Sequence, residues 1–255
     1  IARVLNFAGL VPPEQSRFFN WSKPFVQLET TRGCFNTCAF CVSGGEKPVR
    51  TLSIESIRRR LQLIHAHGIK NVRVLDRTFN YNPRRAKELL RLFLEFHPDI
   101  RFHLEIHPAL LSEELKEELS LLPKGLLHLE AGIQSLREPV LEKSRRMGKL
   151  SDALDGLRFL CALPNMETHA DLIAGLPLYH LHEIFEDVRT LAEYAAGEIQ
   201  LESLKLLPGT EMRRRAEESG IKYSPLPPYE VLQTHEINVS ELQTARQLSR
   251  LLDGF

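Results

Sequence analysis

The feature that most restricts the fold is an alternation along the chain. From about residue 25 onward, a short apolar run rich in β-prone residues is followed by a longer segment with helical spacing, and this unit recurs about six times. Strands separated by helices have to be parallel, and crossover helices cover the faces of a parallel sheet. The sequence therefore predicts an α/β fold, namely a partial (β/α)6 TIM-type barrel with parallel strands.

The expected elements have definite places in the sequence. The predicted strands are Phe25–Glu29, Asn71–Leu75, Arg101–Ile106, Leu126–Ile133, Thr168–Ile173 and Glu198–Leu204. The predicted helices, with apolar residues at i, i+3, i+4 and i+7, are Ile54–His67, Pro83–Phe96, Ser112–Leu121, Ser151–Leu163 and Leu181–Ala195. Residues 24–210 are expected to form the barrel, 1–23 an N-terminal arm and 211–255 a C-terminal helical extension.

Composition narrows the class of protein. A chain of 255 residues with 43% hydrophobic and 26% charged residues is typical of a globular domain. Its 33 basic and 33 acidic residues give no net charge, which argues against a dedicated nucleic-acid binder. The runs Arg58–Arg60 and Arg213–Arg215 leave a nucleic-acid role open, although such runs on helices are usually solvated. No apolar run has the ~18 residues that a membrane span requires. Because Ile1 is not a methionine and no leader follows it, we expect a piece of a longer chain rather than a secreted precursor.

Three of the four cysteines are clustered. Cys34, Cys38 and Cys41 form a C-x3-C-x2-C spacing directly after the first predicted strand, whereas Cys161 lies in an apolar helix and is expected to pack in the core. Thiolates are the ligands of iron–sulfur clusters, and three of them leave one iron of a four-iron cluster open. A structural zinc site would need a fourth ligand nearby. The spacing therefore predicts an iron–sulfur site in a reducing compartment, which we take to be the cytoplasm.

The cysteine motif, with Phe40 in the aromatic position before its last cysteine, resembles the signature of the radical S-adenosylmethionine (radical SAM) enzymes. The resemblance implies a [4Fe–4S] cluster on Cys34, Cys38 and Cys41, with SAM bound to the fourth iron. It also implies reductive cleavage of SAM to a 5′-deoxyadenosyl radical, hydrogen abstraction from an unidentified substrate, and a reducing partner such as flavodoxin or ferredoxin.

Residues after the second and third strands are candidates for SAM binding. Radical SAM enzymes usually have a glycine-rich turn after the second strand, but here the loop offers Asp76 and Thr78 instead. Capping of the following helix by Asp76 or Asn80 is the alternative. Glu105 lies at the end of the third strand, where a carboxylate suits the two hydroxyl groups of a ribose.

The fourth and fifth strands resemble those of the oxygen-independent coproporphyrinogen oxidase group. That resemblance implies that Gln134 and Arg146 bind polar groups of SAM, with Arg145 as the competing arginine. It also implies that Asp171 lies on the ribose side of the nucleoside and that the backbone around Gly175 lies beside adenine. Glu130 could equally be a capping carboxylate or a substrate contact. Three further residues, His103, His107 and His169, could face the barrel interior, but lone histidines are more often structural and receive no role.

A wider resemblance covers almost the whole chain. Stretches similar to those of cobalamin-associated radical SAM proteins of unassigned function are Glu29–Cys34, Leu75–Asn80, Leu204–Thr210 and Pro227–Leu232. Because the chain lacks the D-x-H-x-x-G cobalamin-ligand motif, any cobalamin would bind through a domain outside this sequence. The expected reaction is hydrogen abstraction or cobalamin-linked methyl transfer. Two alternatives are a non-catalytic metal-binding or interaction module that has lost SAM chemistry and an RNA-modifying radical SAM enzyme.

Overall fold

The structure is a computed structural model that describes residues 9–194 and 197–253. Residues 1–8 of the predicted arm, Ala195 at the predicted end of the fifth helix, and the last two residues of the predicted extension lie outside the described residues.

Six parallel strands form one sheet, in which their spatial order is their order along the chain. These strands are β1 (Val26–Leu28), β4 (Asn71–Val74), β5 (Arg101–Ile106), β6 (Leu127–Gln134), β7 (Glu167–Ala174) and β8 (Glu198–Ser203). Neighbouring strands pair in parallel along the whole sheet, from β1 to β8. The predicted partial barrel is therefore confirmed.

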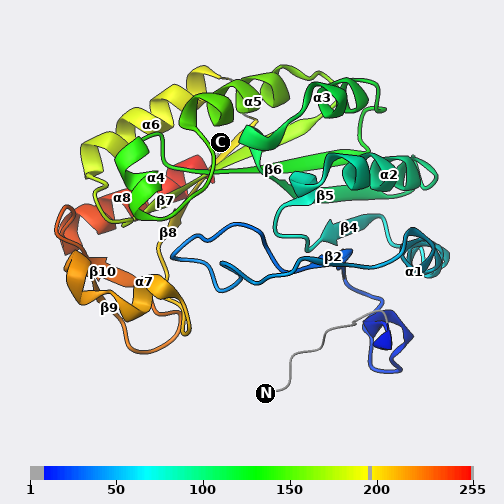
Figure 1. Ribbon diagram of the computed structural model, residues 1–255, viewed down its shortest axis with the longest axis horizontal. Helices are drawn as coiled ribbons and strands as arrows, with labels where there is room; N and C mark the ends of the chain where they lie inside the picture. The colour runs from blue at the N-terminus through cyan, green and yellow to red at the C-terminus, as the bar shows by residue number, and fades with distance from the viewer. Residues whose placement is uncertain (1–8, 195–196, 254–255) are drawn as a thin grey trace.

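The helices lie along the outer face of the curved sheet (Figure 1). They are α1 (Ile54–Ala66), α2 (Pro83–Leu94), α3 (Glu113–Ser120), α4 (Glu138–Lys143), α5 (Leu150–Ala162) and α6 (Leu181–Glu193). The five predicted helices are present with small shifts at their ends. The prediction missed α4, because six residues are too few for helical periodicity to be visible.

Burial alternates along the strands and separates the two faces of the sheet. On β5, Phe102 and Leu104 are fully buried under the helices, and Phe102 stacks on Phe93 of α2 with ring centroids 4.0 Å apart. The intervening His103 and Glu105 are half-buried on the opposite face. Since side chains of a strand alternate between faces, the polar residues line the inner, concave face of the barrel.

The C-terminal segment contains two short strands as well as helices. Its elements are α7 (Glu211–Arg214), β9 (Lys222–Tyr223), β10 (Val231–Gln233) and α8 (Val239–Leu252), and β9 pairs with β10 in antiparallel fashion. Helix α8 packs against β8 and α6, so it extends the outer helical layer (Figure 1). The segment therefore covers β8, the last strand of the sheet.

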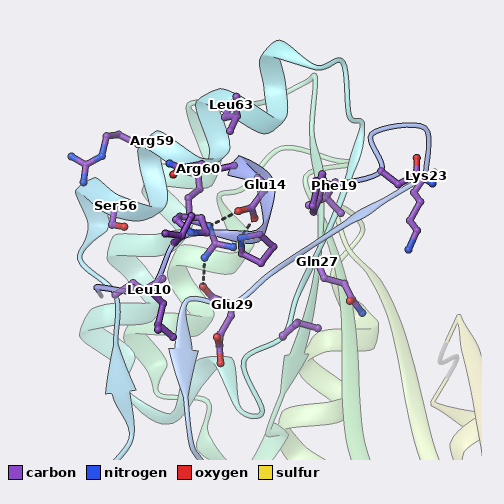
Figure 2. A pocket seen from close by; sticks show the side chains of 18 of the residues that line it. Leu10, Glu14, Phe19, Lys23, Gln27, Glu29, Ser56, Arg59, Arg60 and Leu63 are labelled. Carbon is purple, nitrogen blue, oxygen red and sulfur yellow. Dashed lines mark hydrogen bonds and ion pairs between the residues drawn. The ribbon is translucent and has the colours of Figure 1, made fainter. Parts of the chain in front are cut away.

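The described part of the N-terminal arm is attached to α1 by a buried ion pair. Glu14, in the short 3-10 helix Pro13–Gln15, is only 3% exposed and accepts a hydrogen bond from Arg60 Nη2 at 2.6 Å. Arg60 also donates to the backbone oxygen of Glu29 at 3.1 Å (Figure 2). A cavity of about 690 Å³ lies between the arm and α1 (Figure 2). The expectation that the whole Arg58–Arg60 run is solvated is wrong for Arg60, because the arm covers it.

No helix among the described residues is long and apolar enough to cross a membrane.

Candidate cluster and cofactor site

The loop that carries the three cysteines is closed at its base by a small hairpin. Strands β2 (Thr31–Arg32) and β3 (Arg50–Thr51) pair in antiparallel fashion on either side of it. Within the loop, the backbone nitrogen of Cys34 donates to Glu46 O at 3.0 Å, and that of Gly45 donates to Asn36 O at 2.7 Å. These backbone bonds fix the path of the loop independently of any bound group.

Two glycines make this compact path possible. Gly33 has a φ of +102°, and a β-carbon there would lie 2.5 Å from Glu46 O. A β-carbon at Gly44 would lie 2.5 Å from Cys38 O. Both separations are far shorter than a van der Waals contact, so any side chain at these positions would force the loop open.

The thiols form a donor set that fits an iron–sulfur cluster. Cys34 and Cys38 are buried, Cys41 is half-buried, and all three are free. Burial raises the pKa of the Cys38 thiol, the adjacent Arg146 guanidinium partly offsets this, and the neighbouring thiols at Cys34 and Cys41 raise it further. The sulfurs of Cys34 and Cys41 are therefore close enough to affect the ionisation of Cys38. Three thiolates on one pinned loop match the ligands that a [4Fe–4S] cluster requires when one iron is left for another ligand.

The far side of the cysteine loop is attached to segments that come much later in the chain. The backbone nitrogen of Ala39 donates to Ser144 O at 2.9 Å, and its oxygen accepts from the Met212 nitrogen at 2.8 Å. Phe40, the aromatic residue of the motif, is half-buried and packs against the core. In Figure 1 the blue loop accordingly reaches from the β1 side of the barrel to α7.

Asp76 holds the beginning of this loop. It lies just after β4, is 1% exposed, and accepts hydrogen bonds from the backbone nitrogens of Thr30 and Thr31, each at 2.8 Å. The Thr30 hydroxyl donates to its second oxygen. The helix-capping alternative is wrong, because Asn82 caps α2. Burial raises the pKa of Asp76 and the threonine hydrogen bonds oppose that shift. Both carboxylate oxygens are engaged, so the arrangement favours a positioning role, and the contact with SAM stays a prediction.

Thr78 and Glu105 lie next along the same rim. The Thr78 hydroxyl oxygen is 3.9 Å from Cys34 Sγ and donates to Arg77 O at 2.6 Å. Glu105 lies 3.8 Å from Arg77 Nη1. Burial raises the pKa of Glu105 to about 7, with the charge of Glu130 adding to the shift and Arg77 opposing it. Glu105 therefore changes charge near neutral pH.

Gln134 and Arg146 come together beside the cysteines. A register shift between Gly132 and Gln134 marks a bulge near the end of β6, and such a bulge re-aims the side chain that follows it. A β-carbon at Gly132 would lie 2.6 Å from Gln134 Nε2 and 3.3 Å from Arg146 Nη2, so glycine leaves the space that both side chains occupy. Arg146 donates to Gly132 O at 2.6 Å and lies 3.8 Å from Cys38 Sγ. Arg145 instead pairs with the C-terminal Glu211, so Arg146 is the arginine at the site.

The two predicted residues on and after β7 differ in their surroundings. Asp171 is half-buried on the inner face, where burial and the charge of Glu130 raise its pKa to about 9. Gly175 has a φ of +90°, and a β-carbon there would touch Leu242 of α8 at 3.4 Å. The predicted contacts of Asp171 with the nucleoside and of the Gly175 backbone with adenine stay predictions.

Sequence reasoning missed a histidine cluster on the inner face. His103 Nε2 lies 2.8 Å from Glu130 Oε2, and His169 Nδ1 lies 2.9 Å from His128 Nε2. Together with Asp171 these residues line a cavity of about 560 Å³. Burial lowers the pKa of His128 to about 4, and burial raises the pKa of Glu130 while the imidazoles of His103 and His169 lower it by more. The cluster is therefore a group of hydrogen-bond donors and acceptors that is partly shielded from water.

A signal for this cluster is visible in the sequence. A histidine is followed two residues later by a carboxylate on each of three consecutive strands, as His103-Leu-Glu105, His128-Leu-Glu130 and His169-Ala-Asp171. Residues two apart on a strand share a face, so the repeated pattern predicts that the six side chains lie on one face of the sheet.

Comparison with known protein families decides the identity of the fold and site. The family model described as the radical SAM superfamily matches residues 28–191, which is more than half of the chain. The chain belongs to the radical SAM superfamily. This family of enzymes uses a [4Fe–4S] cluster and SAM, so the predicted resemblance of the cysteine motif is confirmed.

Two curated relatives are, by their names, a methylthiotransferase that acts on a ribosomal protein and a synthase of a modified tRNA nucleoside. Ribosomal protein uS12 methylthiotransferase RimO of Moorella thermoacetica is 28% identical over an alignment of 190 residues, and the match covers 69% of this chain and 43% of that protein. The tRNA-2-methylthio-N(6)-dimethylallyladenosine synthase of Herpetosiphon aurantiacus is 25% identical over an alignment of 210 residues, and the match covers 75% of this chain and 46% of the relative. The chain thus spans less than half the length of these relatives.

Solved structures of similar fold include cobalamin-dependent radical SAM enzymes. The methyltransferase TsrM of Kitasatospora setae, with cobalamin and a [4Fe–4S] cluster bound, has a TM-score of 0.66 and 21% identity, covering 88% of this chain and 46% of its own. The cobalamin-dependent enzyme OxsB has a TM-score of 0.64 and 15% identity, covering 89% of this chain and 41% of its own. The predicted likeness to cobalamin-associated radical SAM proteins therefore agrees with the fold.

Proposed function

We propose that this chain is the catalytic domain of a cytoplasmic radical SAM enzyme that binds a [4Fe–4S] cluster through Cys34, Cys38 and Cys41. The observation that carries the proposal is the pinned loop, in which three free thiols lie at the carboxyl end of β1 with Arg146 beside one of them. Active sites of parallel α/β barrels lie at this end of the strands.

The polar residues around the loop have distinct tasks in the proposal. Arg146 favours the thiolate form of Cys38 by its positive charge, and with Gln134 it offers hydrogen-bond donors to the polar groups of SAM. Glu105 accepts hydrogen bonds from the ribose hydroxyls, Asp171 lies on the ribose side of the nucleoside, and Phe40 packs behind the loop. When bound, the cluster supplies the electron for reductive cleavage of SAM, and flavodoxin or ferredoxin is the proposed source of that electron. The barrel walls then keep water from the cleavage site.

The deciding experiment is anaerobic reconstitution of the chain with iron and sulfide. We expect a brown protein that converts SAM to 5′-deoxyadenosine or S-adenosylhomocysteine only when dithionite is present, measured by liquid chromatography. A colourless protein that contains zinc instead of iron and leaves SAM intact would contradict the proposal and favour a module that has lost SAM chemistry.

The product distinguishes the two proposed reaction classes. 5′-Deoxyadenosine indicates hydrogen abstraction, whereas S-adenosylhomocysteine formed only with added cobalamin indicates cobalamin-linked methyl transfer, with the cobalamin held outside this chain. The names of the curated relatives include a ribosomal protein and tRNA. These names favour, as a second candidate function, a radical SAM enzyme that modifies a macromolecule. Incubating the reconstituted protein with total tRNA or with ribosomes tests it by mass spectrometry of the recovered RNA and protein.

Glu105 makes the proposed SAM site sensitive to pH. Its pKa, raised to about 7, means that the carboxyl is protonated below neutrality and loses one acceptor for a ribose hydroxyl. We expect the dissociation constant of SAM, measured by isothermal titration on the reconstituted protein, to rise as the pH falls from 8 to 6. The Glu105→Gln variant should bind more weakly and show no such change around neutrality. An unaltered pH profile in the variant would exclude Glu105 from the ribose site.

A further inference from the structure

The inner face of the barrel holds a group of imidazole and carboxylate side chains that is separate from the cysteine loop. The strand register places His103 opposite His128, Glu130 opposite His169, and Gly132 opposite Asp171. Side chains of these residues therefore meet across three neighbouring strands. None of them is needed to bind the cluster, so the group calls for its own explanation.

The hydrogen bond between two imidazoles orients His169. Its Nδ1 lies 2.9 Å from His128 Nε2, and one hydrogen has to lie between these two nitrogens. When His169 Nδ1 carries that hydrogen, its Nε2 has a free lone pair. A histidine that binds a metal typically donates its other ring N–H in this way, which fixes the tautomer and the ring orientation.

The free nitrogen faces two carboxylate oxygens. His169 Nε2 lies 3.4 Å from Asp171 Oδ1 and 3.6 Å from Glu130 Oε2. Within residues 9–194 and 197–253, neither His169 Nε2 nor Asp171 Oδ1 makes a well-formed hydrogen bond, although His169 is only 5% exposed. Three acceptor atoms thus converge in a place with little water.

These separations match those of ligands around one metal ion. All three atoms lie within 4.8 Å of one another. Ligand atoms bound at ~2.0–2.1 Å in a tetrahedron lie about 3.4 Å apart, which is close to the observed spacings. Imidazole nitrogen and carboxylate oxygen are ligands that zinc and the other divalent first-row metals accept.

We propose that His169 Nε2, Glu130 Oε2 and Asp171 Oδ1 bind a divalent transition-metal ion inside the barrel. His128 and His103 are positioning residues, since they hold His169 and Glu130 through hydrogen bonds. The remaining coordination positions open into the 560 Å³ cavity, where an oxygen or nitrogen atom of a substrate can complete the site. Asp171 uses one carboxylate oxygen for the ion and keeps the other for a hydrogen bond. The proposal adds a second metal site to the domain, and this site shares Asp171 with the proposed ribose site.

A different set of three groups competes for the same region. His128, His169 and Glu198 also lie within 4.8 Å of one another. That set would use the imidazole pair as two ligands instead of as a hydrogen bond, and Glu198 is exposed to solvent. The first arrangement needs Asp171 as a ligand and the second needs Glu198. Variants at these two positions therefore form a matched pair.

The experiment is a zinc titration of the full chain with its cluster reconstituted, in competition with a chromophoric chelator under anaerobic conditions. We expect one Zn²⁺ per chain while the iron content and cluster absorbance stay unchanged. The variants Asp171→Asn and Glu130→Gln each remove a proposed ligand and should weaken zinc binding by at least the ~10- to 100-fold that is typical when a residue supporting a ligand is lost. Glu198→Gln and the surface variant His97→Ala should bind zinc like the unmodified chain.

The positioning role of His128 has a separate readout. His128→Leu removes the acceptor for His169 Nδ1, so zinc affinity should fall, whereas His128→Gln keeps an acceptor and should restore most of it. Equal affinity in both variants would contradict that role.

Several results would overturn the metal site. They are an absence of zinc binding in the cluster-loaded chain, zinc binding that Asp171→Asn leaves intact, and a loss of binding in Glu198→Gln. The isosteric amide variants keep the test valid even if a histidine variant fails to fold. Because zinc is counted on protein whose SAM cleavage is assayed separately, failure of either proposal is recognised without the other.

Discussion

Replacing any one of Cys34, Cys38 and Cys41 by alanine is expected to abolish dithionite-dependent cleavage of SAM. A four-iron cluster held by three protein thiolates loses a third of its protein ligands with each substitution. Burial of Cys34 and Cys38 means that no solvent-exposed group of the loop can take the place of either sulfur. We therefore expect the iron and sulfide content of the reconstituted variants to fall sharply and product formation to fall to the level of a protein-free control.

Cys161→Ala is the matched control for these substitutions. The Cys161 thiol is half-buried on α5, packs against the core, and has a pKa that burial raises to about 11. Such a thiol is a poor ligand at neutral pH, so the variant should keep full iron content and activity. A loss of the cluster in Cys161→Ala, or its retention in one of the loop variants, would contradict the assignment of ligands.

The second large effect is expected from Asp76→Ala. The substitution leaves the buried backbone nitrogens of Thr30 and Thr31 without their acceptor. Each orphaned buried donor costs about 1–3 kcal/mol, so we expect the free energy of unfolding to fall by about 3–4 kcal/mol. Urea denaturation of the cluster-free chain measures this quantity. Since Asp76 holds the entry to the cysteine loop, the variant should also load less iron.

Asp99→Ala and Asp76→Asn serve as comparisons. Asp99 is a fully exposed carboxylate that pairs with His65 and Lys70, and solvent screens such surface pairs, so its loss should change stability little. Asp76→Asn retains one carbonyl acceptor and should be intermediate. If Asp76→Ala unfolds like the unmodified chain but binds SAM much more weakly, Asp76 contacts SAM and the positioning role is wrong.

Periodicity was sufficient to predict the barrel. The strands and five helices come from local patterns, because apolar spacing and cap residues such as Ser53 and Ser112 act within a few residues. The cysteine loop is equally predictable, since its three cysteines lie close together in sequence. Local signals failed for α4, which is too short to show a period.

Other parts of the site depend on contacts between distant segments. The sequence around Asp76 indicates SAM or a helix end as its partner, and nothing near it indicates Thr30. In the sequence, Arg60 belongs to a basic run that is typical of a solvated helix face. The folded arm places Glu14 against it. The choice between Arg145 and Arg146 likewise required the position of Cys38. No single histidine indicates the histidine cluster, because the cluster forms only where three neighbouring strands bring their side chains together.

The attachment of Ala39 to Ser144 and Met212 has a consequence for the order of assembly. The cysteines are synthesised before two partners of their loop, which lie over a hundred residues later in the chain. Contacts between such distant residues form late, because the intervening chain has to be organised first. The cysteine loop therefore gains its final shape only when the barrel is nearly complete. Insertion of an iron–sulfur cluster should accordingly act on a folded domain rather than on a nascent chain.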